Sequence, residues 1–281
     1  MNGTTTLIIG AALATIMFGM GLSLTVDDFK RILKNPKAVL LGLSNQLLFL
    51  PIIGYLLVST LELSPEISIG IMILASCPGG AVSNIVVNLA KGDLALSITL
   101  TAISSIISIF SIPFIVLFAL LEFAGEGEKI SLDVLQMIGQ LIVIVILPVF
   151  TAMFIRAKSP EFALRMGKTV RIASVFLLVL ITVGLLIKER NNIIPYFLQA
   201  GIPAMLLNLT SLGLGYITAY LIQLKKPQAI TIAVESGIQN SALAMTIAIL
   251  TLQKSELGIA AAIYTLVMYI SGFMVIILGR R

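Results

Sequence analysis

The sequence has no histidine, no tryptophan, one cysteine and few charged residues. Of its 281 residues, 58% are hydrophobic and only 11% are charged, whereas a soluble domain carries about a quarter charged residues. The absence of histidine excludes Ser-His and Cys-His catalysis, histidine metal sites and histidine proton relays. Cys77 alone cannot form an internal disulfide. With a mean hydropathy of +1.10, the composition predicts an all-α polytopic membrane protein that forms a single domain over 1–281 and is not an enzyme.

Nine apolar segments are separated by charged or turn-forming residues. At about 20 residues per crossing, they predict nine transmembrane helices near 5–24, 38–61, 67–89, 94–121, 134–155, 166–187, 193–224, 229–252 and 257–278. Of the 18 Lys and Arg residues, 14 fall in the loops after the first, third, fifth and seventh segments, in the first turns of segment six, or in the C-terminal tail. The positive-inside rule therefore predicts an external N-terminus and a cytoplasmic C-terminus.

The same distribution explains the net charge of +5 without a basic patch, so no nucleic-acid partner is expected. The lipid bilayer is the expected environment, and no obligate protein partner is evident. The compact chain is typical of a bacterial inner (cell) membrane protein.

An internal duplication is visible in the spacing of the segments. The midpoints of segments one to four recur in segments six to nine with an offset of roughly 160 residues. Because five crossings is an odd number, the second set must enter the membrane upside down. Inverted repeats of this kind are typical of secondary transporters, although hydropathy alone can produce such a spacing by chance.

The third segment of each set is interrupted at its centre. Segment three contains Pro-Gly-Gly at 78–80, and segment eight contains the polar run ESGIQN at 235–240. Unwound backbone is tolerated in a bilayer only where protein or a water-filled cavity satisfies it. Its free carbonyl oxygens suit Na⁺, and the restarted helices direct their positive dipole ends towards an anion. The alternative interpretation is a pair of packing kinks, since Pro and Gly are common in membrane helices.

Glu235 is the one carboxylate of 13 that lies near the centre of a predicted span. An acidic residue there costs about 2.5–3.5 kcal/mol on insertion scales. No Lys or Arg lies near the middle of any predicted span, so a bound cation is the simplest source of compensating charge. The alternative is a protonated, hydrogen-bonded structural glutamate.

Neutral oxygen ligands for such a cation are available nearby. The candidates are Ser83 and Asn84 after the first break, Ser97 and Thr101 on one face of segment four, and Gln46 in segment two. Singly, each is as well explained by helix packing. Asn208 lies at the position that corresponds to Gln46 in the second repeat and is a weaker candidate.

Four motifs of the sequence resemble the bile acid:sodium symporter family, in the order and spacing of that family. They are FGMGLSLTVDDF (18–29), CPGGAVSN (77–84), LALSITLT (94–101) and ESGIQNSALA (235–244). The resemblance extends along the whole chain and implies a nine-helix member of this family, with an inverted repeat and two crossed discontinuous helices, the third and the eighth. It also implies a core domain formed by the helices near 38–61, 67–89, 94–121, 193–224, 229–252 and 257–278, and a panel domain formed by those near 5–24, 134–155 and 166–187.

The resemblance further implies two bound Na⁺ ions. The first would be held by Ser83, Asn84, Ser97, Thr101 and Glu235. The second would be held by Gln46, Glu235 and Gln239, with the backbone carbonyls of Ser236 and Ile238. Substrate would contact Ala81, Val82, Asn240, Met268 and Tyr269.

The residues at the implied substrate positions differ from the family pattern, whereas those at the implied ion positions match it. Bacterial relatives often have Thr at the position of Ala81 and a polar pair at Met268 and Tyr269. The resemblance therefore implies sodium-coupled import of an organic anion, either bile-acid-like or a small carboxylate such as pantoate or pyruvate. A proton-coupled or sodium-independent anion carrier or exporter of the same fold is the alternative, and an intramembrane enzyme or a non-transporting sensor fits the residues less well.

Overall fold

The computed structural model describes residues 3–30, 35–125, 132–191 and 193–280, and the predicted all-α fold is confirmed for them. Within these residues the only β-pairing is a single isolated bridge. The elements are α1 (Gly3–Gly21), α2 (Val26–Lys30), α3 (Pro36–Ser44), η2 (Asn45–Phe49), α4 (Leu50–Thr60), α5 (Pro65–Ser76), α6 (Ala81–Leu89), α7 (Leu94–Phe123), α8 (Val134–Leu141), η3 (Ile142–Ile146), α9 (Leu147–Lys158), α10 (Pro160–Lys188), α11 (Ile193–Leu221), α12 (Lys226–Gly237), α13 (Ser241–Thr246), η4 (Ile247–Thr251), η5 (Ser255–Gly258) and α14 (Ile259–Gly279).

Helical segments occupy all nine predicted ranges. Fewer than nine of them, however, are continuous helices long enough to cross a membrane. By length and composition, five helices in the described residues can span a membrane: Pro36–Thr60, Leu94–Phe123, Val134–Lys158, Ile193–Leu221 and Ser255–Gly279. A bent pair, Pro160–Gly167 and Ile172–Lys188, makes a sixth if it is counted as one span. The remaining apolar helices are short, and two of the predicted spans are short because each is cut by a central break.

The helix ends follow simple local rules. Pro65 and Pro160 stand in the first turn of α5 and α10, where the missing N–H of proline costs no hydrogen bond. Asp93 caps α7 by accepting a hydrogen bond from the backbone N–H of Leu96. The π-helical turns η2 and η3 lie inside longer helices and η4 ends the helix that begins with α13, and such turns are frequent at functional sites. Gln46 lies in the first of them.

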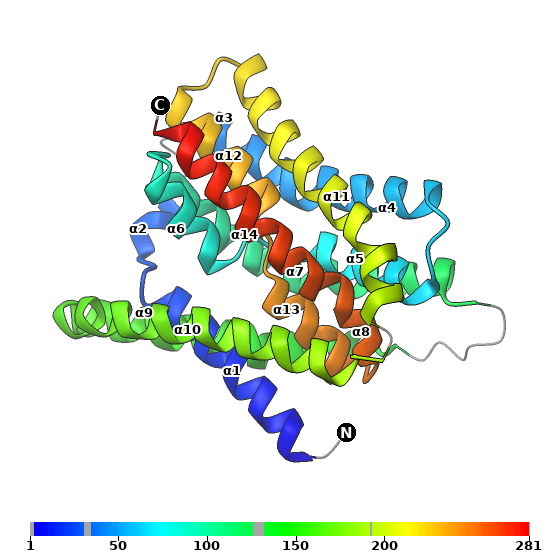
Figure 1. Cartoon of the computed structure of the whole chain (residues 1–281). Helices are drawn as coiled ribbons and strands as arrows, with labels where there is room; N and C mark the ends of the chain where they lie inside the picture. Colours follow the sequence, from blue (N-terminus) through cyan, green and yellow to red (C-terminus); the bar gives the residue numbers. More distant parts are fainter. Residues whose placement is uncertain (1–2, 31–34, 126–131, 192, 281) are drawn as a thin grey trace.

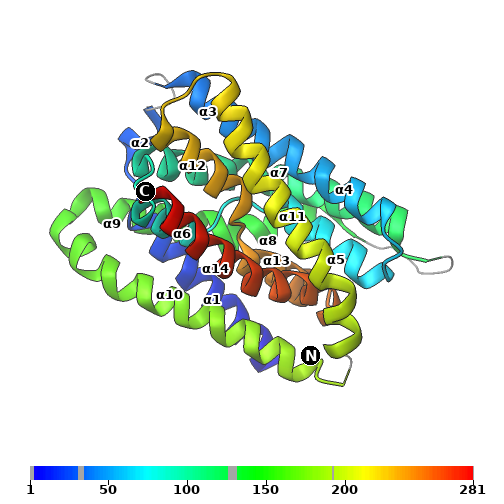
Figure 2. The same cartoon turned by 45° about the horizontal axis from the view of Figure 1, so that its top comes forward.

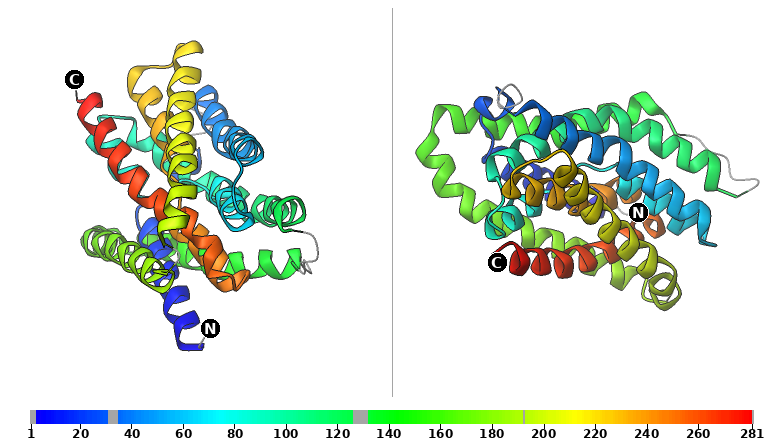
Figure 3. Two further views of the ribbon diagram at one scale, coloured as in Figure 1. Left: turned by 45° about the vertical axis from the view of Figure 1, so that its right-hand side comes forward. Right: turned by 90° about the horizontal axis from the view of Figure 1, so that it is seen from above.

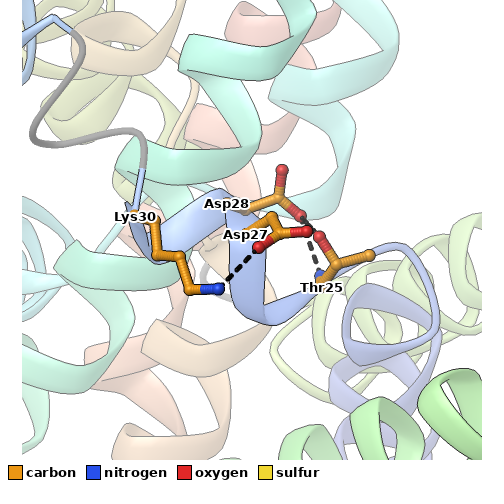
Figure 4. Close-up of polar contacts among 4 residues, drawn as sticks. All are labelled: Thr25, Asp27, Asp28 and Lys30. Atoms are coloured by element: carbon orange, nitrogen blue, oxygen red, sulfur yellow. Dashed lines mark hydrogen bonds and ion pairs between the residues drawn. The ribbon is translucent and has the colours of Figure 1, made fainter.

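The turn between α1 and α2 is closed by hydrogen bonds between Thr25 and Asp28 (Figure 4). The backbone N–H and the Oγ1 hydroxyl of Thr25 both donate to Asp28 Oδ2, at 2.8 and 2.7 Å. The carbonyl of Asp28 accepts a bond of 2.9 Å from Thr99 Oγ1 of α7. Asp27 instead forms an exposed ion pair with Lys30 at 2.9 Å. The acidic residues of the FGMGLSLTVDDF motif therefore shape and anchor α2.

Two groups of helices lie on opposite sides of the molecule. Helix α1 packs along α9 and α10, and Figure 1 shows these three together, with α3, α4, α11 and α12 above them and α13 reaching down to their level. The views in Figure 3 show the same separation. In the upper group, α12 packs against α11 and α7, and α5 packs against α4, α7 and α14. Figure 2 shows α11 and α14 running in front of α12 and α13.

The interrupted helices form the centre of the protein. All residues from Ile67 to Ser76 in α5, from Ala229 to Gly237 in α12, and throughout α13 are buried. The surrounding helices instead expose large apolar side chains, among them Phe114, Phe154 and Phe176. Exposed apolar surface of this extent is expected for helices that face lipid. The polar residues at the two breaks are therefore shielded from the bilayer.

Candidate functional site

The two helix breaks cross each other at the centre of the protein. Helix α5 ends at Ser76 and α6 begins at Ala81, while α12 ends at Gly237 and α13 begins at Ser241. Gly79 and Gln239 form the isolated antiparallel bridge. Beside it, the backbone N–H of Asn240 donates to the Pro78 carbonyl at 2.9 Å. Both predicted interruptions are therefore real breaks, and backbone hydrogen bonds join them.

Gly79 is required at the crossing by lack of space. A Cβ atom at this position would lie 2.5 Å from Glu235 Oε2 and 2.8 Å from Gln46 Nε2. Gly80 has more room, because the nearest atom to its Cβ would be 3.4 Å away. The first of the two glycines thus allows the carboxylate of α12 to approach the backbone of the α5–α6 break.

The Glu235 carboxylate is surrounded by hydroxyl groups. Ser83 Oγ and Ser97 Oγ each donate to Oε1 at 2.6 Å, and Thr101 Oγ1 donates to Oε2 at 2.9 Å. Ser97 Oγ also lies 2.7 Å from Asn84 Oδ1. The structure therefore brings together all five residues that the sequence suggested for a first ion site, from α6, α7 and α12.

A second cluster surrounds the C-terminal carbonyls of α12. Gln46 Nε2 donates to the Glu235 carbonyl at 2.7 Å and lies 3.4 Å from Glu235 Oε2. Gln239 Nε2 donates to the Ser236 carbonyl at 2.6 Å. The Ile238 N–H donates to the carbonyl of Val234 at 2.8 Å. The residues suggested for a second ion site are thus also adjacent, and they share Glu235 with the first.

The electrostatics of this centre favour a small cation. Glu235 is 0% exposed, and within the described chain every donor to its carboxylate is a neutral hydroxyl or amide. The amide oxygens Oε1 of Gln46 and Gln239 are buried and have no hydrogen-bond partner among the described residues. Within the described residues, no three His, Cys, Asp or Glu side chains come together in a group that could hold a metal ion. This set of mostly neutral oxygen atoms suits a hard cation of low charge better than a transition metal.

A cavity of about 330 Å³ lies beside the crossing, between α1 and α10 on one side and the restarted helices α6 and α13 on the other. Four of the five predicted substrate positions line it: Ala81, Val82, Asn240 and Met268. Asn84 and Gln239 also line it and connect the cavity with the two clusters. The Asn240 side chain has a local role as well, because its Oδ1 accepts from the N–H of Leu243 and caps α13.

Tyr269 is the predicted substrate residue that the structure does not bring to this cavity. Successive residues of a helix point in directions about 100° apart, and at this place in α14 the cavity is lined by Met268. Asn208 is also separate from the Glu235 side chain. Its Nδ2 donates to the Gly237 carbonyl at 2.7 Å, so it contacts the same break from another side.

Sequence reasoning missed the contribution of α1 and α10. Ser23, in the turn after α1, and Ser174 of α10 line the cavity, and isolated serines near or in apolar helices carried no signal. Tyr264 was also missed, because it is a single polar side chain in an apolar helix. Its hydroxyl donates to the Gly237 carbonyl at 2.7 Å. Only the tertiary structure shows which polar residues of the outer helices face inwards.

Broken, crossed helices with polar centres define the class: an α-helical membrane protein built like a secondary transporter. Residues 11–195 match the model of the sodium bile acid symporter family. A sodium-dependent transporter of uncharacterized role from Bacillus subtilis, YocS, is 30% identical over 93% of this chain and 79% of its own length. The human ileal sodium/bile acid cotransporter is 28% identical over 88% of this chain and 70% of its own.

A probable chloroplastic sodium/metabolite cotransporter of rice (Oryza sativa subsp. japonica) is 27% identical over 96% of this chain and 63% of its own length. The chain belongs to the sodium bile acid symporter family. The resemblance drawn from the motifs is therefore confirmed, and the family is one of membrane transporters, not of enzymes.

Proposed function

We propose that this protein is a sodium-coupled symporter that imports an organic anion. The observation that carries this proposal is the Glu235 carboxylate, which is 0% exposed and is surrounded by neutral oxygen and amide groups. A buried ionised carboxylate needs a nearby positive charge. Within the described residues no cationic side chain supplies it, and Na⁺ is the co-transported ion that the names of the relatives give.

Two Na⁺ ions would be bound, one in each cluster. Ser83, Asn84, Ser97 and Thr101 would hold the first with Glu235, and Gln46, Gln239 and the carbonyls of Ser236 and Ile238 would hold the second with it. The hydroxyl and amide groups that now donate hydrogen bonds would turn their oxygen atoms to the ions. The two unpartnered amide oxygens support this assignment.

The transport cycle would be a movement of two domains. The helices α1, α8–α9 and α10 would form the panel, and the remaining long helices would form the core, in nine crossings arranged as an inverted repeat with an external N-terminus. The anion cavity lies beside residues 16–23, which form the end of α1 and the turn after it. A second cavity of about 730 Å³ lies beside residues 8–15 of the same helix. Cavities near both ends of α1 support a site that is exposed to each side of the membrane in turn.

A side-chain contact joins the two groups of helices next to the second cavity. Lys188 Nζ of α10 donates to Ser255 Oγ of η5 at 2.7 Å, and Ser255 Oγ donates to Glu189 Oε1 at 2.7 Å. In the proposed orientation this contact is on the external side of a bacterial inner membrane. It would close the external path while the anion cavity opens to the cytoplasm.

The substrate would be an organic anion of modest size. The cavity of about 330 Å³ lies at the lower end of the range for small-molecule sites, about 300–1,000 Å³. Its walls are mainly apolar, and helices α6 and α13 begin at its edge. Their positive dipole ends would bind the carboxylate of the substrate. A small carboxylate therefore suits it better than a bile acid.

The test is the thermal stability of the purified protein in NaCl and in KCl at equal ionic strength, for wild type and Glu235→Gln. At 10 to 100 times its dissociation constant, sodium should stabilise the wild type by about 1.4–2.7 kcal/mol, or a few degrees. Glu235→Gln should lose this response. Uptake of pyruvate, pantoate and taurocholate into proteoliposomes with and without a sodium gradient then identifies the anion.

A wild type that responds equally to both salts would contradict sodium coupling. Acid-stimulated uptake that persists without sodium would then establish the alternative, a proton-coupled carrier of the same fold. Anion export driven by an inward sodium gradient would keep the coupling to sodium but replace symport by exchange.

A further inference from the structure

The carbonyl of Gly237 receives two side-chain hydrogen bonds from two different helices. Asn208 Nδ2 of α11 donates to it at 2.7 Å, and the Tyr264 hydroxyl of α14 donates to it at 2.7 Å. Both side chains are 0% exposed. They also lie beside each other, with Asn208 Nδ2 3.4 Å from the Tyr264 hydroxyl. Two fully buried donors are thus committed to one backbone oxygen.

This carbonyl is the last of helix α12, and it has no intrahelical partner because the helix ends there. Helix α11 closes tightly on it, since a Cβ atom at Gly237 would collide with the Leu212 side chain. The other end of the same peptide unit, the Ile238 N–H, donates to Val234 at 2.8 Å. The peptide unit between Gly237 and Ile238 is therefore held at both ends.

The direction of this carbonyl differs from that of its neighbours. The carbonyls of Glu235 and Ser236 accept from Gln46 and Gln239, whereas that of Gly237 turns to α11 and α14. The next carbonyl, that of Ile238, lies between the peptide unit held by Asn208 and Tyr264 and the Gly79–Gln239 bridge. Its orientation is consequently set from both sides.

We propose that Asn208 and Tyr264 are positioning residues for the second sodium site. They hold the Gly237 carbonyl away from the ion and so present the carbonyls of Ser236 and Ile238 to it. The inference rests on the proposed function, because it assigns a role within the ion site, but the observations that carry it are independent of Glu235.

Tyr264→Phe removes one hydroxyl and keeps the ring and the Asn208 bond, so the variant should fold. The sodium concentration for half-maximal thermal stabilisation should rise about three- to tenfold, as expected for the loss of one buried hydrogen bond. Asn208→Leu should act in the same direction. In the double variant, the rise in this sodium concentration should be larger than the product of the two single rises, because the carbonyl then loses both donors. Tyr216→Phe, at a tyrosine of α11 that is 42% exposed, is the control and should match the wild type.

A merely structural tie between helices predicts a different result. Tyr264→Phe would then melt earlier in KCl but keep the sodium dependence of the wild type, and this outcome would overturn the inference. In proteoliposomes, saturating sodium should restore the substrate half-saturation of Tyr264→Phe to the wild-type value. A wild type without any sodium response would instead contradict the proposed function itself.

Discussion

The two helix breaks at the centre of the protein are held open by different means. At the α5–α6 break, backbone groups satisfy the free carbonyls: Asn240 N–H donates to Pro78, and the N–H of Ser83 in the following helix donates to Gly80. At the α12–α13 break, side chains do so. Besides Gln239 within the break, donors come from η2, α11 and α14, namely Gln46, Asn208 and Tyr264.

This difference indicates a division of roles between the breaks. The α5–α6 break needs little space and few side chains, so it provides a fixed backbone surface. The α12–α13 break depends on amide and hydroxyl groups that can rotate towards an ion. The second break is therefore the part of the centre expected to change its hydrogen bonds when sodium binds, and side-chain deletions should affect it more.

The largest effect is expected at the contact between the two breaks. Gly79→Ala would place a methyl group 2.5 Å from Glu235 Oε2, which the buried crossing cannot accommodate. The variant should lose the sodium-dependent rise in melting temperature, measured in NaCl against KCl. Gly80→Ala is the matched control and should retain that rise, since its Cβ meets no atom closer than 3.4 Å. Equal behaviour of the two variants would show that the close approach of Glu235 is unimportant.

An intermediate effect is expected for the hydroxyl groups on the carboxylate of α12. Ser97→Ala removes the donor 2.6 Å from Glu235 Oε1, and a hydrogen bond to a charged group contributes about 1.5–3 kcal/mol. The half-saturating sodium concentration should rise at least about tenfold. Ser104→Ala, on the same helix, removes a hydroxyl that donates only to the backbone carbonyl of Thr101. This variant should change the half-saturating sodium concentration by less than about twofold. If Ser104→Ala matches Ser97→Ala, the loss reflects helix packing.

The smallest effect is expected for a side chain at the α5–α6 break. Ser76 is buried, but its Oγ donates only to the Ile73 carbonyl of its own helix, at 2.7 Å. Ser76→Ala should therefore leave both the melting temperature and the sodium dependence nearly unchanged, within about 0.5 kcal/mol. A loss as large as that of Ser97→Ala would remove the proposed distinction between the two breaks.

Much of the centre could be predicted from local sequence. Two features are unusual in apolar segments because each is costly in a bilayer: Pro78 with its two glycines, and the single carboxylate among the polar residues at 235–240. Ser97 and Thr101 are four residues apart, so helix geometry places them on one face. Tyr269 could not be placed, since hydropathy does not tell which side of an apolar helix faces a cavity.

The helical, membrane-embedded character of the chain, the places where two helices break and the need of Glu235 for a partner can all be predicted from the sequence. These properties depend on composition and on neighbours along the chain. The crossing of the breaks at Gly79 and Gln239, the part of α1 and α10 in the cavity, and the meeting of Asn208 and Tyr264 at Gly237 become visible only in the folded protein. Such contacts join residues far apart in the chain, and their geometry depends on how whole helices pack.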